Sequence, residues 1–192
     1  LVVLATHRVV GGIEGFEPRE FLLRLTSGFT LMKIADRSDP RSKESAKQRM
    51  LATMRTVHDR GETPLGIYTG DGTFHVAVLK DKSLMKAAAP DKSEAWQTLD
   101  VAVLQKLILE GLLALDEERM GNSDFVEYIK DVPNAIDGII SQIDAGAKQV
   151  AFFTNPVKMR QLVAVTDAGE RMPHKSTYFF PKMYTGLTIQ KL

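Results

Sequence analysis

Cysteine is absent from the 192 residues of this chain. Its absence excludes disulfide bonds, thiolate metal ligands and cysteine nucleophiles from this sequence. A chain without cysteine suits a reducing compartment, and we therefore expect a cytoplasmic protein.

A surplus of charge of one sign is also lacking, because 25 basic and 24 acidic residues leave a net charge of +1. Nothing in this balance attracts nucleic acid or an anionic membrane surface, and we expect neither as a partner. The longest apolar run, TLDVAVLQKLILEGLLAL at 98–115, is interrupted by Asp100, Gln105, Lys106 and Glu110. It falls short of the about 20 apolar residues that a membrane span requires.

The sequence also lacks the common catalytic and metal-binding motifs. Its histidines, at positions 7, 58, 75 and 174, are too far apart for an H-E-x-x-H pair, so we expect no metal site. No G-x-S-x-G motif marks a serine hydrolase. Catalytic residues and cofactors therefore stay unassigned.

The chain opens with LVVLATHRVV, an apolar run rich in β-branched residues. This pattern predicts a strand over 1–10 and does not resemble a signal peptide. Since the first residue is not methionine, we interpret residues 1–192 as a single domain from the C-terminal part of a longer protein.

Periodicity and turn residues divide the rest of the chain into helices and strands. Helices are expected at 18–28, 41–60, 99–115, 134–146 and 156–168, and further strands at 29–34, 125–129, 150–155, 176–180 and 186–192. Residues 84–92 and 116–124 are expected to form loops. The helix at 99–115 is the most apolar and is expected to form the centre of the core.

The stretch LGIYTGDGTFHVAVLKD predicts a β-hairpin at about 65–80, because Asp71-Gly72 suits a tight turn that needs positive φ. Helices and strands otherwise alternate. We therefore predict an α/β or α+β fold in which helices pack on a mixed β-sheet.

The helix expected at 41–60 carries six basic and two acidic residues, not counting histidine. A nucleic-acid site would need interleaved aromatic residues, which this segment lacks. We favour a solvated face, or salt bridges to the acidic region 110–137.

The segment GERMPHKST at 169–177 differs from a phosphate loop, G-x-x-x-x-G-K-[ST], at one key position, where His174 replaces the second glycine. A phosphate loop leaves a strand and opens a helix, whereas here a helix is expected to end at Gly169 and a strand to follow. Gly169 is better explained as a helix C-cap.

Period-two alternation in the extended stretch 172–187 places Lys175 and Thr177 on one face and Ser176 on the other. Two interpretations remain open. The stretch is an edge strand with solvated lysines, or Lys175, Ser176 and Thr177 contact an anionic ligand.

Thr6, His7 and Arg8 interrupt the apolar first strand. Ligands of open α/β sheets bind at strand ends, which makes this trio a second candidate for anion contacts. The alternative is a partly buried, hydrogen-bonded histidine beside a surface arginine.

The motif Met-Pro-x-Lys-Ser-Thr-x-Phe-x-Pro-Lys at 172–182, together with THRVV and LDVAVLQKLILEGLL, resembles the C-terminal part of an uncharacterised, mainly bacterial family, domain of unknown function 1015. His174 departs from the Pro or Gln expected there. Relatives in this family carry an upstream Ala-Asp-Gly-His-His-Arg stretch that this chain lacks. The resemblance implies that any phosphoryl or nucleotide chemistry depends on that stretch, and it supplies no established activity.

Two functional hypotheses follow from these observations. In the first, the chain is the C-terminal domain of a small-molecule enzyme that binds an anionic or phosphorylated metabolite through Thr6, His7, Arg8, Lys175, Ser176 and Thr177. In the second, it is a structural or dimerisation domain, and an apolar edge near 178–180 forms a homodimer contact.

Overall fold

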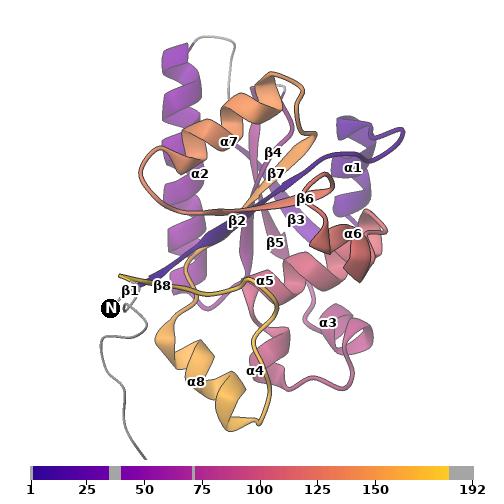
Figure 1. The fold of residues 1–192 in the computed structure, drawn as a ribbon, viewed down its shortest axis with the longest axis vertical. Coiled ribbons are helices and arrows are strands. Elements are labelled where there is room, and N and C mark those ends of the chain that lie inside the picture. The colour runs from indigo at the N-terminus through magenta and orange to yellow at the C-terminus, as the bar shows by residue number, and fades with distance from the viewer. Residues whose placement is uncertain (1, 35–39, 71, 182–192) are drawn as a thin grey trace, which may run out of the picture.

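The computed structural model describes residues 2–34, 40–70 and 72–181 (Figure 1). The strands are β1 (Val2–Leu4), β2 (Thr6–Val10), β3 (Phe29–Ile34), β4 (Pro64–Tyr68), β5 (Phe74–Leu79), β6 (Val126–Lys130), β7 (Val150–Phe153) and β8 (Tyr178–Phe180). The helices are α1 (Pro18–Leu25), α2 (Pro40–Asp59), α3 (Ser83–Ala88), α4 (Glu94–Gln97), α5 (Asp100–Val103), the π-helix η1 (Leu104–Leu112), α6 (Glu117–Gly121), α7 (Ala135–Asp144) and α8 (Met159–Asp167).

Six strands form the main sheet in the order β3-β5-β4-β7-β2-β6, and every pair in it is antiparallel. The predicted hairpin is confirmed as β4 and β5, and Gly72 in its turn has a φ of 74°. Asp71 lies outside the described residues. Antiparallel pairing with helices on the sheet confirms the α+β alternative of the predicted fold.

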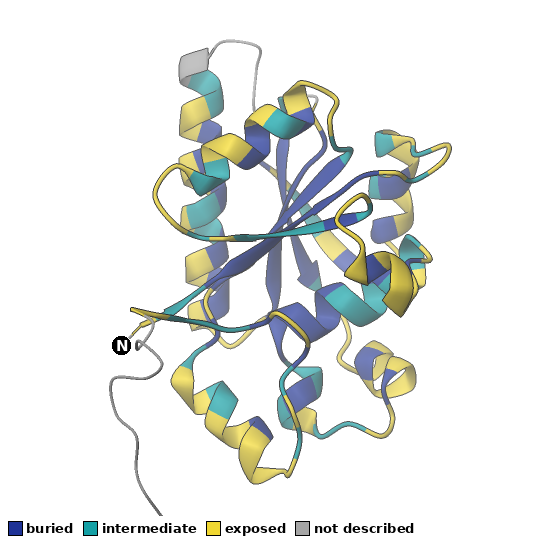
Figure 2. Ribbon diagram, viewed as in Figure 1, coloured by how far each residue is buried: buried dark blue, intermediate teal, exposed yellow. Residues whose placement is uncertain are grey.

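Helices cover both faces of this sheet, and each face has its own apolar core (Figure 1). The α2 and α7 helices cover one face, where Met50 and Met54 pack with Phe153. On the other face, α1, α3, η1 and neighbouring helices pack against Leu65 and Phe152. The central strands are therefore buried on both sides (Figure 2).

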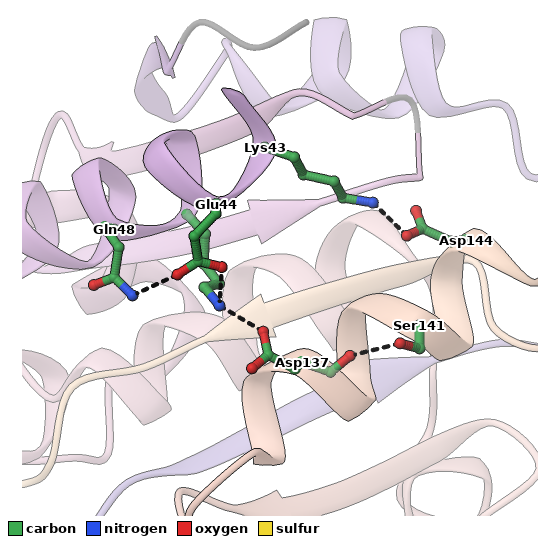
Figure 3. Close-up of polar contacts among 7 residues, drawn as sticks. Lys43, Glu44, Gln48, Asp137, Ser141 and Asp144 are labelled. Carbon is green, nitrogen blue, oxygen red and sulfur yellow. Dashed lines mark hydrogen bonds and ion pairs between the residues drawn. The ribbon is translucent and has the colours of Figure 1, made fainter. Parts of the chain in front are cut away.

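Charged side chains join the two helices of the first face (Figure 3). Lys47, which is 7% exposed, donates to Asp137 at 2.5 Å, and Lys43 donates to Asp144. Tyr68 also donates to Asp144. The salt bridge between the basic helix and the acidic region predicted from the sequence is thus confirmed at Lys47 and Asp137.

The C-terminal segment returns from α8 to lie beside the start of the chain (Figure 1). Gly169 has a φ of 73° and donates to the Thr166 carbonyl at 2.9 Å, while Glu170 donates to the Val165 carbonyl at 3.1 Å. These bonds form a Schellman motif, so the predicted C-cap is confirmed. Residues 178–180 then pair antiparallel with β1 in a separate two-stranded sheet.

The structure differs from the expectation at four segments: 1–10, 84–92, 99–115 and 116–124. The strand expected over 1–10 is divided at Ala5 into β1 and β2, which belong to different sheets. Helices α3 and α6 occupy segments expected to be loops, because Met85 and Met120 bury their side chains in the core. The helix expected at 99–115 winds as a π-helix from Leu104 onward. The strand expected at 186–192 lies outside the described residues.

No helix within the described ranges has both the length and the hydropathy needed to cross a membrane.

Gly66 allows α2 to approach the sheet closely. A Cβ at this position would lie 2.6 Å from the Met54 sulfur and 3.0 Å from Phe153 Cβ, which is fixed to its strand. We expect Gly66→Ala to lower the free energy of unfolding by about 1–3 kcal/mol through overpacking, measured by urea denaturation. Gly138→Ala, in α7 where no neighbouring element lies within 4 Å of the added carbon, should raise it by about 0.5–1 kcal/mol. Equal effects of the two substitutions would contradict this account.

Candidate anion-binding site

Buried polar side chains gather at one end of the main sheet. This end is formed by the start of β2, the start of β4 and the residues that follow β7. Its buried polar residues are Thr6, His7, Arg8, Thr63, Thr154 and Asn155. Burying polar groups is costly unless they are hydrogen-bonded, so such a cluster indicates a structural network or a binding site.

The register of β2 and β6 determines which of these side chains share a face. Arg8 lies opposite Tyr128, and Thr6 lies opposite Lys130. Directly opposed residues of antiparallel strands project to the same side of the sheet. Thr6, Arg8, Tyr128 and Lys130 therefore form one surface, and His7 projects to the other face, where it packs edge-on to Phe153.

The Arg8 guanidinium, only 3% exposed, connects β2 to the C-terminal segment. Its Nη1 donates to the Thr6 carbonyl, and its Nη2 donates to the Lys175 carbonyl at 3.3 Å. Burial lowers the pKa of Arg8 to about 10, so the side chain is still charged at neutral pH. No carboxylate pairs with it among the described residues.

Lysine and tyrosine side chains alternate around this surface. The Lys175 Nζ lies 4.3 Å from the centre of the Tyr128 ring, and the Lys130 Nζ lies 4.1 Å from the centre of the Tyr178 ring. Arg8 also lies over Tyr128, at 5.4 Å. Cation–π contacts hold these charges in place without neutralising them.

A pocket of about 320 Å³ lies between β6 and the C-terminal segment, and we call it the cationic pocket. Its lining residues are Thr6, Gly121, Ser123, Val126, Glu127, Tyr128, Lys130, Lys175, Thr177 and Tyr178. Strand alternation directs the Glu127 side chain to the face opposite Tyr128 and Lys130. Arg8 lies behind the pocket wall and positions Lys175, without lining the pocket itself.

A larger cavity of about 760 Å³ adjoins the cationic pocket, since Gly121 and Tyr128 line both. It is otherwise lined by Gln105, Lys106, Glu110, Ala114, Leu115, Asp116, Glu117, Met120 and His174. Three of these residues are acidic, so the two cavities differ in charge.

The structure therefore brings together four of the six residues singled out from the sequence. Thr6, Lys175 and Thr177 line the cationic pocket, and Arg8 lies directly behind it. His7 lies on the other face of the sheet. Ser176 is 3% exposed, and its hydroxyl has no hydrogen-bond partner in the described part of the chain.

The regular alternation expected over 172–187 is wrong in its described part, 172–181. Lys175 adopts a left-handed conformation with a φ of 52°, and the strand begins only at Tyr178. This turn lets Lys175, Thr177 and Tyr178 all line one pocket. Lys182 lies outside the described residues. No helix begins between Ser176 and Pro181, which is inconsistent with a phosphate loop.

His7 and His58 each lie close to a carboxylate. The Thr154 amide donates to His7 Nδ1 at 3.4 Å, which leaves the proton of the neutral ring on Nε2, 3.6 Å from Asp131. His58 Nδ1 lies 3.2 Å from Asp100, and both side chains are buried. Burial raises the pKa of Asp100, against the opposing effect of His58. Among the described residues, no group of three potential ligands could hold a metal ion.

The sequence reasoning missed Tyr128, Lys130 and Tyr178. The alternation in VEYIK was visible, but only the register of β6 against β2 shows that Tyr128 lies opposite Arg8. Asp100 was noticed only as a break in an apolar run, and that break was the available signal for a buried carboxylate.

Comparisons with known proteins give no relative for this chain: no family model, no curated protein and no solved structure matches it.

The contact between His7 and Asp131 predicts a pH dependence of stability. The proximity of the His7 ring, 3.6 Å away, lowers the pKa of Asp131 below its ordinary value. A carboxyl with a lowered folded pKa stabilises the fold above its unfolded pKa of about 4, and this stabilisation is lost as the pH falls through the folded value. We expect Asp131→Asn to flatten this part of the profile of melting temperature against pH. Parallel profiles for the two proteins between about pH 2 and 6 would contradict the assignment.

Proposed function

We propose that this chain binds a small anionic or phosphorylated metabolite in the cationic pocket, as a domain of a small-molecule enzyme. One observation carries the proposal: Arg8, Lys130 and Lys175 lie around two tyrosine rings, and none of them has a carboxylate partner among the described residues. The resemblance to domain of unknown function 1015 stays a prediction beside it.

Electrostatics explains why unpaired cations point to a ligand. Arg8 is buried, and protein interiors usually compensate a buried charge with an ion pair, whereas Lys130 and Lys175 are exposed. A bound anion would supply that compensation here. The hydroxyl groups of Thr6 and Thr177, which line the same pocket, would add neutral hydrogen-bond donors, whereas the Tyr128 hydroxyl already donates to the Met120 carbonyl at 3.2 Å.

Phosphate and carboxylate groups are suited to such a site. Charge-assisted hydrogen bonds from lysine are about twice as strong as neutral ones. A pocket of about 320 Å³ is at the small end of the range for ligand sites, which favours a small compound or the head group of a larger one. These contacts support binding, and the reaction of the enzyme stays unassigned.

One observation favours the alternative, a homodimer contact. Val2 and Phe180 pair across the two-stranded sheet and are 55% and 50% exposed, although both are apolar. Isolated two-stranded sheets have little stability of their own, so a second chain could cover this one. A stable dimer in light scattering that Phe180→Ser abolishes, with no effect of anions on melting, would support this alternative.

We expect Lys175→Met and Lys130→Met each to weaken binding of a phosphorylated metabolite about 10-fold or more, because each removes a charge-assisted contact worth about 1.5–3 kcal/mol. Binding would first be detected by a thermal-shift screen of phosphorylated metabolites and then measured by calorimetry. Each variant is compared with its own unliganded melting temperature, which separates lost binding from lost stability.

Lys86→Met is the matched control. Lys86 lies on α3 and lines a different pocket, beside Lys82 and Lys92, so its loss removes the same charge from elsewhere on the molecule. Equal weakening by all three substitutions would mean that net charge, and not the cationic pocket, controls binding.

A further inference from the structure

We infer that residues 174–181, which we call the strap, close over the cationic pocket when the anion binds and are open for a substantial fraction of the time without it. This inference rests on the proposed function and adds the regulation of the same site. Three features support it: the few attachments of the strap, the cost of its closed conformation, and its share of the pocket.

The chain that leads into the strap is firmly held. The Glu170 carboxylate accepts the Ser93 amide at 2.9 Å and also bonds the Ser93 hydroxyl. Two residues further on, Met172 packs against the apolar core, and Pro173 is buried. The strap therefore starts from a fixed point, and any opening occurs beyond Pro173.

The strap itself is attached at few points. Arg8 donates to the Lys175 carbonyl at 3.3 Å, which is long for such a bond. Cation–π contacts join Lys175 to Tyr128 and Lys130 to Tyr178, and they contribute only modestly because both lysines are exposed. Among the described strands, β8 and β1 pair only with each other, over three residues (Figure 1). A ladder of this kind has little stability of its own.

The closed conformation carries two local costs. Lys175 has a φ of 52°, a left-handed backbone that residues other than glycine adopt only with strain. The Ser176 hydroxyl is buried, and it has no hydrogen-bond partner within the described ranges. A hydroxyl in this state has lost its bonds to water without replacement.

Opening the strap would remove both costs at once. The backbone of Lys175 could then relax to an ordinary conformation, and water would bond the Ser176 hydroxyl. These gains offset the few attachments that opening would break. Without a ligand, the closed and open arrangements are therefore close in free energy, and the structure shows the closed one.

The strap carries one side of the cationic pocket. Lys175 and Thr177 line the pocket from the strap, whereas Thr6 and Lys130 line it from β2 and β6. An anion between them contacts both sides only when the strap is closed. A ligand shifts a conformational equilibrium by its difference in affinity for the two states, so anion binding favours closure.

Hydrogen–deuterium exchange of the whole chain, followed by mass spectrometry, tests this coupling. Inorganic phosphate at ten times its dissociation constant should slow exchange of the amides of residues 175–180 about 10-fold. Ser176→Ala removes the buried hydroxyl and should favour the closed strap about 5–10-fold, so the same amides should exchange more slowly by this factor without phosphate. Its affinity for phosphate, measured by calorimetry, should rise by up to the same factor, because more of the protein is competent to bind.

Thr69→Val is the matched control. The Thr69 hydroxyl is also buried without a hydrogen-bond partner in the described part of the chain, but it follows β4 and does not line the cationic pocket. Its removal should leave both the exchange of the strap and the affinity for phosphate unchanged.

The outcomes separate the strap from the proposed function. If phosphate binds but neither phosphate nor Ser176→Ala slows exchange of residues 175–180, the strap is wrong and anion binding stands. Equal effects of Ser176→Ala and Thr69→Val would also overturn the strap, because general stabilisation would explain both. If phosphate neither binds nor slows exchange, the proposed function is wrong as well. Should Ser176→Ala not fold, the unsubstituted chain with and without phosphate still decides between these outcomes.

Discussion

The contact of Arg8 with two backbone carbonyls is the interaction on which the candidate site depends. Arg8 is buried in β2, and its guanidinium bridges the Thr6 carbonyl and the Lys175 carbonyl, 167 residues further along the chain. A lysine has no planar fork that could hold two acceptors in this way. By fixing the position of Lys175, this contact brings the C-terminal segment over β6 and creates the cationic pocket. The same charge, held without a carboxylate, contributes to the positive potential there.

The sheet and its helices provide the rigid support for this arrangement. The antiparallel register of β2 and β6 aligns Arg8 with Tyr128, and cores on both faces hold these strands in place. On the far side, the salt bridges from Lys47 to Asp137 and from Lys43 to Asp144 tie α2 to α7 (Figure 3), and the bond from Tyr68 to Asp144 ties β4 to α7. Partly buried, well-connected pairs of this kind fix the relative position of two helices more than they add to stability. The C-terminal segment has less support, because its one strand within residues 169–181 pairs with β1 alone.

Local patterns predicted most of the elements but not the way in which they meet. The hairpin followed from Asp71-Gly72, and the end of α8 followed from Gly169, because turn and cap residues act over a few positions. The division of the first strand at Ala5 could not be predicted, since both halves contain strand-forming residues and only their partners differ. The π-helical winding after Leu104 was equally hidden, because an apolar stripe fits either helix. Thr6, Arg8, Lys175 and Thr177 were found from their residue types alone, whereas Tyr128 and Lys130 needed the register of β6.

Net charge averages over separated regions of the molecule. A value of +1 suggested no charge-driven interaction. In the fold, however, Lys130 and Lys175 are placed beside one cavity, and Asp116 and Glu117 beside the next, with Tyr128 between them. Over such short separations, charges near a protein surface interact well within a Debye length and are only partly screened. The local electrostatic potential at each cavity therefore depends on where the charges of the chain lie and not on their sum.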